Sequence, residues 1–170
     1  REITGVGCKD CKAAIDETNG NIEKSVELLR KKGIAKASKR MGRVASEGLV
    51  CISKKENNFS IIEINSETDF VAKNDEFINF SEEVAKIALE SKGKMENISL
   101  SKMENKKSVN DNLIDLVTKI GEKITLRRSS FIESTNTINF SYIHGAQKEN
   151  VGKLGVLVAI ETNKTKKDIM

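Results

Sequence analysis

The segment from Phe59 to Asn74 constrains the fold of this chain more than any other. Residues 59–65 follow an apolar, alternating pattern that is typical of a β-strand with a buried face. This pattern runs directly into Thr68-Asp69-Phe70, and a long helical pattern begins after Asn74. Thr68 and Asn74 are residue types that cap helices. The sequence therefore predicts a strand-to-helix corner at which a carboxylate and a large aromatic ring stand side by side.

Two interpretations of this corner remain open from the residues alone. In the first, Phe70 belongs to the core and Asp69 caps a short turn. In the second, both side chains face outward, where an exposed aromatic residue can fill a pocket on a partner. The neighbouring carboxylate could then disturb a cation or phosphate site by its charge.

The first 42 residues are expected to form short helices. Residues 8–18 have a helical apolar face, and Asn21 can cap the helix that follows. That helix begins at Ile22 and is expected to end at Gly33, and residues 34–41 then form a third, basic helix. Helices this short are not stable alone in water, so they need each other or a partner.

The remainder of the chain mixes strands with helices, which predicts the α+β class with an antiparallel sheet. A polar turn over residues 54–58 joins two of the strands into a hairpin. Residues 94–108 are rich in Lys, Asn and Glu and are expected to form a mobile connection, and residues 133–137 a turn. Strands are expected at 48–53, 59–65, 124–132, 138–144 and 155–162, and helices at 75–91 and 109–120.

Size and composition set broad limits on function. A chain of 170 residues can form one or two domains. Its net charge of +4 permits an acidic protein partner and does not require nucleic acid. No apolar run is long enough to span a membrane. Three cysteines in a chain of this length do not form a disulfide framework, which favours a reducing compartment.

The sequence gives little support for catalysis or for metal binding. Cys8 and Cys11 form a C-x-x-C motif, but no strand precedes it and its only further ligand candidates, Cys51 and His144, are distant. We therefore expect one buried and one exposed cysteine on a helix. His144 is the only histidine and is expected to be a hydrogen-bonded structural residue. The G-x-x-x-x-G-K-[ST] phosphate loop is absent. The chain is thus expected to be neither an enzyme nor the holder of a cofactor.

A basic stretch over residues 31–43 offers an alternative function. Its cations could follow the phosphates of RNA, although no aromatic residues lie between them, which favours a solvated helix face or a steering patch instead. The stretch contains Lys31, Lys32, Lys36, Lys39, Arg40 and Arg43. A further alternative is a binding module that uses only the N-terminal helices.

Two segments resemble the signatures of the elongation factor Ts family. Residues 1–12, with Thr4-Gly5-Val6-Gly7 and Asp10-Cys11-Lys12, are similar to the first signature. Residues 63–74 are similar to the second throughout, and His144-Gly145 with residues 155–158 resembles a third, looser landmark. The resemblance extends from residue 1 to about residue 162. It implies a ubiquitin-associated-like three-helix module over residues 1–42, a first core subdomain over 44–137, and an incomplete second subdomain over 138–170. Most of the module's first helix is expected to be missing.

The resemblance also implies a function, which is guanine-nucleotide exchange on elongation factor Tu during translation elongation. Phe70 would wedge into the G domain of that GTPase, and Asp69 would help to displace the groups that hold its magnesium ion. The other implied contact residues are Thr68, Val71, Ile120, Gly121, His144, Gly145, Arg1, Cys8 and Lys9. The implied location is the bacterial cytoplasm, with a mitochondrial or plastid matrix as the alternative.

Overall fold

The sheet is built around an antiparallel hairpin. The computed structural model describes residues 2–133 and 136–162. Strand β1 (Glu47–Lys55) pairs along its whole length with β2 (Asn58–Ser66), and the order in the four-stranded sheet is β3-β2-β1-β5. Strand β3 (Ile124–Ile132) pairs with β2, and the short β5 (Val151–Gly152) pairs with β1. The predicted α+β class and antiparallel sheet are confirmed, although β5 was not expected.

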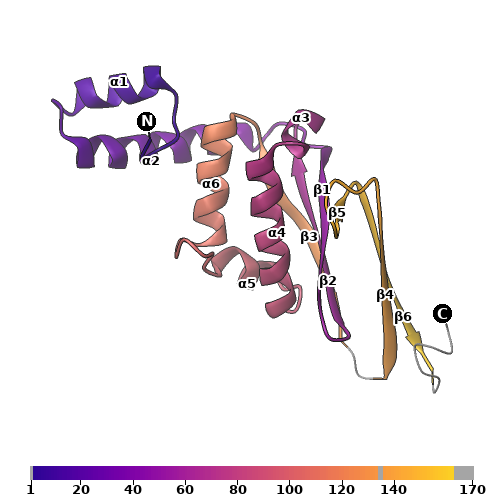
Figure 1. Cartoon of the computed structure of the whole chain (residues 1–170). Coiled ribbons are helices and arrows are strands. Elements are labelled where there is room, and N and C mark those ends of the chain that lie inside the picture. Colours follow the sequence, from indigo (N-terminus) through magenta and orange to yellow (C-terminus); the bar gives the residue numbers. More distant parts are fainter. Residues whose placement is uncertain (1, 134–135, 163–170) are drawn as a thin grey trace.

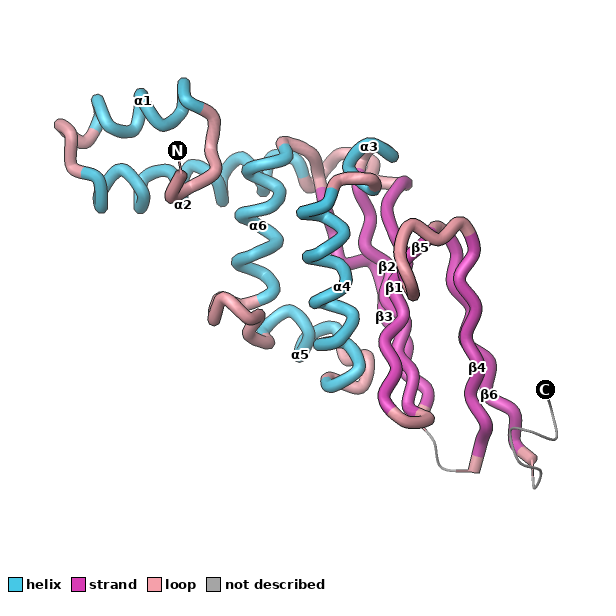
Figure 2. The backbone as a smooth tube through the Cα atoms, viewed as in Figure 1, coloured by secondary structure: helices cyan, strands magenta, loops and turns pink. Residues whose placement is uncertain are grey.

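A layer of helices covers one face of this sheet (Figures 1 and 2). Helix α4 (Asp75–Glu90) packs on β1 and β2, and α6 (Val109–Ile120) lies beside it. Asn74 caps α4 as predicted, because its side chain accepts the backbone N–H groups of Glu76 and Phe77. The predicted apolar face of α4 is buried, and it forms the main core together with residues from the sheet and α6: Leu49, Ile62, Ile64, Phe77, Val84, Ile87, Val109 and Ile124.

The connection between α4 and α6 differs from its prediction. It contains the short helix α5 (Met95–Leu100), and it contributes buried Ile98 and Met103 to the core. The backbone N–H of Met103 donates to the carbonyl of Lys107, and that of Val109 donates to the carbonyl of Ser101. The four apolar residues of this segment are irregularly spaced among polar neighbours and give no clear period, so the sequence pattern did not reveal its structure.

The N-terminal region forms two helices, and the predicted break at Gly33 is wrong. Helix α1 (Cys8–Glu17) packs on α2 (Ile22–Arg40), which is continuous through Gly33, so residues 34–41 are not a separate helix. A Cβ atom at Gly33 would lie 2.8 Å from the Oγ1 of Thr118 in α6. Gly33 therefore lets α2 approach α6 closely. A glycine inside a helix costs about 1 kcal/mol relative to alanine, and the close packing of the two helices offsets this cost. The described residues before β1 contain two helices, not three.

The C-terminal strands form a separate two-stranded ribbon. Strand β4 (Thr137–His144) pairs antiparallel with β6 (Leu154–Glu161). A Cβ at Gly155 would lie 2.8 Å from side-chain atoms of Ile61 and Val50, so one face of the ribbon packs close to the sheet. The opposite face exposes apolar residues, namely Tyr142, Leu154, Val156 and Val158. The turn predicted over residues 133–137 lies partly outside the described residues, and the division into subdomains at residues 44, 137 and 138 stays a prediction.

The tightest backbone approach in the sheet predicts a large loss of stability on substitution. Gly48 has φ +135°, and a Cβ there would lie 2.1 Å from the carbonyl oxygen of Ile64 on the paired strand. We expect Gly48→Ala to lower the free energy of unfolding by about 3 kcal/mol or more, because neither backbone can move without breaking the ladder. Urea denaturation followed by circular dichroism measures this change.

Gly42→Ala is the matched control for this prediction. Apart from Gly42 and its two chain neighbours, no residue comes within 4 Å of a Cβ built on Gly42, and its φ is not positive. We expect a change in the free energy of unfolding of less than about 1 kcal/mol. Equal losses in the two variants would contradict the steric explanation.

Candidate functional site

The predicted corner is a four-residue helix, α3 (Asp69–Ala72), which follows directly after β2. Val71 and Ala72 are buried against the core, whereas the side chain of Phe70 is 79% exposed. Successive residues of a single helical turn point in different directions, so burial of Val71 and Ala72 turns Phe70 toward solvent. The interpretation of Phe70 as a core residue is therefore wrong. Its ring faces solvent, and its contact with a partner stays a prediction.

Thr68 is held by a glutamate from a distant part of the chain. Its backbone N–H donates to Oε2 of Glu122 at 3.0 Å, and its hydroxyl donates to Oε1 of the same carboxylate at 2.8 Å. Thr68 occupies the N-cap position of α3 as predicted, but its side chain makes no capping hydrogen bond because the hydroxyl is bonded to Glu122. Ser66 donates its own hydroxyl to the carbonyl of Thr68 at 2.9 Å. The residue that starts the corner is thus fixed from both sides.

A second carboxylate extends this contact into a junction of three segments. Glu67 accepts the backbone N–H of Lys123 at 2.5 Å and pairs with the guanidinium of Arg43 at 3.3 Å. The ammonium of Lys123 donates to the carbonyls of Met41 and Arg43, at 2.7 and 2.8 Å. We call residues 41–43, 66–68 and 121–123 the corner junction. It joins the end of α2, the start of α3 and the connection from α6 to β3.

The corner junction also places Ile120 and Gly121 close to the corner. Helix α6 ends at Ile120, and Gly121 takes the left-handed conformation, with φ +89°, that a helix C-terminus commonly requires. Glu122 follows immediately and contacts Thr68. The structure therefore brings these two predicted site residues next to the start of α3.

The carboxylate of Asp69 lies among cations on this surface. It pairs with the ammonium of Lys73, one turn later, at 2.7 Å. The hydrogen bond and the charge of Lys73 hold the pKa of Asp69 below its ordinary value, and the charge of Lys153 lowers that pKa further. Asp69 is thus ionised at neutral pH and carries a negative charge beside the exposed ring of Phe70.

His144 and Gly145 lie at the same end of the molecule as α3. Figures 1 and 2 show that the end of β4 lies near the end of the sheet that carries α3. The backbone N–H of Lys153 donates to the carbonyl of His144 at 3.1 Å, and its ammonium pairs with Glu47 at 2.7 Å. The imidazole is exposed and hydrogen-bonded to the hydroxyl of Tyr142 at 3.0 Å. Lys153 therefore links the end of β4 electrostatically to Asp69.

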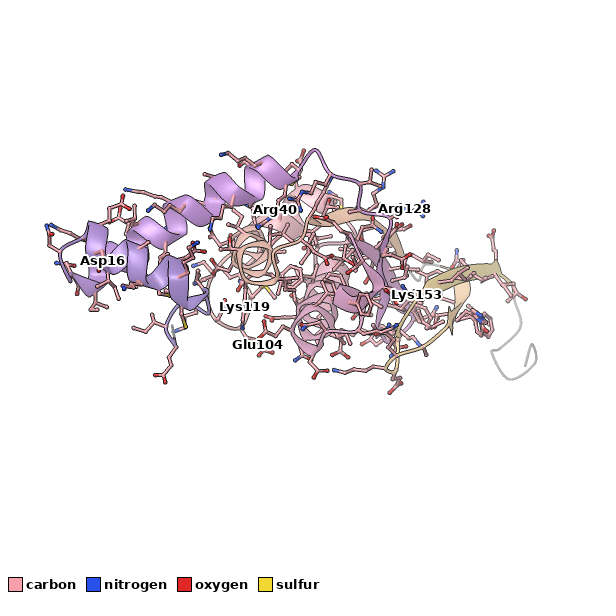
Figure 3. All side chains as sticks on the ribbon, turned by 90° about the horizontal axis from the view of Figure 1, so that it is seen from above. Asp16, Arg40, Glu104, Lys119, Arg128 and Lys153 are labelled. Carbon is pink, nitrogen blue, oxygen red and sulfur yellow. The ribbon has the colours of Figure 1, made fainter. Side chains whose placement is uncertain are left out.

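The predicted N-terminal contact residues lie elsewhere on the molecule. Arg1 lies outside the described residues, and Cys8 and Lys9 are exposed at the start of α1. Figures 1 and 3 show α1 on the opposite side of α6 from the sheet. The preceding loop approaches α6, because a Cβ at Gly5 would lie 3.2 Å from the side chain of Lys119. A pocket of about 480 Å³ opens between this loop, α2 and α6.

Most cations of the basic stretch have intramolecular partners. Lys31 pairs with Glu27 at 2.8 Å and Lys36 with Asp10 at 2.9 Å. The remaining pairs are Lys32 with Glu17, Arg43 with Glu67, and the guanidinium of Arg40 with the carbonyl of Val117. Four of these cations are thus paired with carboxylates, and Arg40 is bonded to a backbone carbonyl.

The cysteines follow the prediction of one buried and one exposed side chain in the motif. Cys8 is exposed and Cys11 is buried, and the three cysteines, all of which are described, form no disulfide. Burial raises the pKa of the Cys51 thiol to about 12, so that group stays protonated. The described residues contain no group of three or more His, Cys, Asp and Glu side chains arranged for a metal ion. Within residues 2–133 and 136–162, no helix has both the length and the apolar character needed to cross a bilayer.

The α+β core and its outward-facing corner are the features that the sequence resemblance implied, and comparison with known proteins identifies the family. A family profile for Elongation factor TS matches residues 67–170. Elongation factor Ts of Methylorubrum populi is 47% identical over 163 residues, which cover 95% of this chain and 53% of that protein. Elongation factor Ts of Bartonella tribocorum is 47% identical over 167 residues, which cover 98% and 54%. This chain belongs to the elongation factor Ts family. It spans about half the length of the curated relatives that it matches.

Sequence reasoning found the corner but missed two residues that define its surroundings. Glu122 and Lys153 lie 54 and 84 positions after Thr68 and Asp69, respectively. Neither belongs to a local motif, and no periodicity connects them with the corner. The sequence offered one indication for Glu122. It directly follows Gly121, which ends the helix, so Glu122 had to lie near the end of α6.

The two cations near Asp69 predict a specific order of pKa changes. We expect Lys73→Met to raise the pKa of Asp69 toward its ordinary value, because the variant loses both a hydrogen bond and a charge. Lys153→Met should raise it less, since Lys153 contributes charge alone. NMR titration of the Asp69 carboxyl carbon measures both shifts, with the unchanged protein as reference. A larger rise in Lys153→Met than in Lys73→Met would refute the assignment.

Proposed function

We propose that this chain acts in translation elongation as a guanine-nucleotide exchange factor that promotes GDP release from elongation factor Tu. One observation carries the proposal, namely the exposure of Phe70, 79%, on a turn that is anchored by buried Val71 and Ala72. Membership of the elongation factor Ts family supports the same conclusion. The proposed activity is a binding effect and not covalent catalysis, and the chain itself needs no cofactor.

Phe70 is suited to anchor an interface. Burial of an exposed phenylalanine contributes about 1.5–3 kcal/mol. Buried Val71 and Ala72, together with Thr68 bound to Glu122, hold the turn in place before a partner arrives. Little ordering entropy is then lost on binding, so more of the burial energy is available for distorting the partner.

Asp69 supplies a negative charge next to this wedge. Its pair with Lys73 is exposed to solvent, where ion pairs contribute little to stability, so the carboxylate can leave it at small cost. Inserted beside the magnesium site of the GTPase, Asp69 would help to displace the groups that hold the ion. The interaction between the factor and GDP is reciprocal, so GDP weakens binding of the factor to the same degree. A thousandfold weakening of GDP binding corresponds to a coupling free energy of about 4 kcal/mol.

The remaining contacts in this proposal spread over a wide surface. Ile120 and Gly121 would touch the partner near the corner, and His144 and Gly145 would touch it on the nucleotide's phosphate side. Helices α1 and α2 would belong to a ubiquitin-associated-like module that grips the G domain through Arg1, Cys8 and Lys9. The corner and the start of α1 lie on different sides of α6, which fits a partner held at two separate places (Figure 1).

We further propose that the chain works in the bacterial cytoplasm and requires neither a membrane nor nucleic acid. The relatives from Methylorubrum populi and Bartonella tribocorum support a bacterial origin. The charges of Lys31, Lys32 and Lys36 are each offset by a neighbouring carboxylate, which lowers the net positive charge offered to RNA and weighs against RNA binding by the basic stretch.

Truncation of the exposed ring tests the proposed function. We expect Phe70→Ala to slow release of fluorescent GDP from elongation factor Tu by at least about tenfold, because a loss of about 1.4 kcal/mol of coupling has that effect. Stopped-flow fluorescence with saturating exchange factor measures the rate. Circular dichroism checks that the variant is folded, which we expect because the removed atoms are exposed.

Leu100→Ala is the matched control for this experiment. Leu100 is 76% exposed at the end of α5 and lies outside the proposed contact surface. Its truncation removes a comparable exposed apolar side chain and should leave GDP release unchanged. If folded Phe70→Ala releases GDP at the same rate as the natural chain, the proposed role of Phe70 as a wedge is wrong.

A further inference from the structure

We infer that Glu122 is a positioning residue, which fixes the start of α3 so that Phe70 is presented outward in one orientation. The inference rests on the proposed function and assigns a role to a residue outside the implied contact set. The observation behind it is the two-point contact between one carboxylate and one residue. Both oxygens of Glu122 are used, one by the N–H and one by the hydroxyl of Thr68.

Helix α3 needs such support because of its length. Four residues make a single turn, which is not stable by itself in water. Its N-terminal N–H groups also receive no side-chain cap from Thr68. Buried Val71 and Ala72 hold the far side of the turn, and the near side, where the chain leaves β2, is held by Glu122 together with the hydroxyl of Ser66.

The contact is suited to setting an orientation. A single hydrogen bond leaves a peptide free to rotate about it, whereas two bonds from one residue to a planar carboxylate fix its direction. The carboxylate is itself placed by its chain neighbours. Gly121 ends α6, and the N–H of Lys123 is bonded to Glu67, so Glu122 is held between two fixed residues. The position of the end of α6 therefore determines the position of Thr68 and the start of α3.

The donor and acceptor pattern makes the inference testable with a neutral variant. Glu122→Ala removes both bonds. Glu122→Gln can keep both, because its amide oxygen accepts the N–H of Thr68 and its amide nitrogen donates to the hydroxyl. Thr68→Val removes the hydroxyl bond and leaves the N–H bond. A positioning role therefore predicts that α3 loses order by increasing amounts along the series. Glu122→Gln should be close to the natural protein, Thr68→Val should be intermediate, and Glu122→Ala should be the most affected.

Amide hydrogen exchange tests the positioning directly, without the partner. The N–H groups of Lys73 and Asn74 donate to the carbonyls of Phe70 and Val71, so their exchange reports opening of α3. We expect Glu122→Ala to speed their exchange by about tenfold and Glu122→Gln by less than about threefold, while the amides between β1 and β2 stay protected. NMR of the whole chain measures these rates.

Glu83→Ala is the matched control. The carboxylate of Glu83 also accepts a backbone N–H, that of Glu104 at 2.5 Å, but it lies on α4 near the α5–α6 connection. Glu83→Ala should leave the amide hydrogen exchange of Lys73 and Asn74 unchanged. Equal effects of Glu122→Ala and Glu83→Ala at these amides, or an effect of Gln as large as that of Ala, would overturn the positioning role.

A double-mutant cycle connects the positioning with function. We expect Glu122→Ala to slow GDP release from elongation factor Tu by about tenfold at saturation, and to have no further effect in a chain that already carries Phe70→Ala. Additive effects would show that Glu122 acts independently of Phe70 and would overturn the inference. If Phe70→Ala alone leaves GDP release unchanged, the proposed function fails, and the hydrogen-exchange series still decides whether Glu122 positions α3.

Discussion

Burial of the apolar face of α4 against the β1–β2 hairpin is the constraint on which the rest of the structure depends. Phe77 and Val84 of α4 are fully enclosed together with Leu49, Ile62 and Ile64 of the hairpin. The chain must then cross from the sheet layer to the helix layer between Ser66 and Asp75. Helix α3 occupies this crossing, and its buried residues continue the core. The exposure of Phe70 is therefore a consequence of how the two layers are joined.

The sequence predicted the parts of this arrangement that have a regular period. Strands β1, β2, β3, β4 and β6 and helices α4 and α6 lie within two residues of their expected bounds, because alternation and helical spacing reflect which face is buried. The corner was also predicted, although its exposure was not, since an aromatic residue at a turn suits a core as well as a surface. Asn74 was recognised as a cap because its bonds are local.

The remaining features depend on contacts between residues that are distant in sequence. Gly33 was expected to end a helix, yet it lies inside α2 because Thr118 of α6 needs the space that a side chain would fill. The two-residue β5 exists through its pairing with Val50 and Cys51. Glu122 reaches Thr68 across 54 positions, and no pattern within either segment announces the other. Such pairings become visible only when the fold has brought the elements together.

The continuity of α2 gives the N-terminal region a mechanical property. Helix α2 has 19 residues and is therefore about 28 Å long. Its last turns rest on α6 and its end is fastened through Lys123, while α1 packs along its other end. Such a helix is a lever arm: a tilt of about 5° at the fastened end moves the far end by about 2.5 Å, given a rise of about 1.5 Å per residue. The distance between α1 and the ring of Phe70 therefore depends on how α2 is seated on α6, which contacts it at Arg30, at Gly33 and at Arg40.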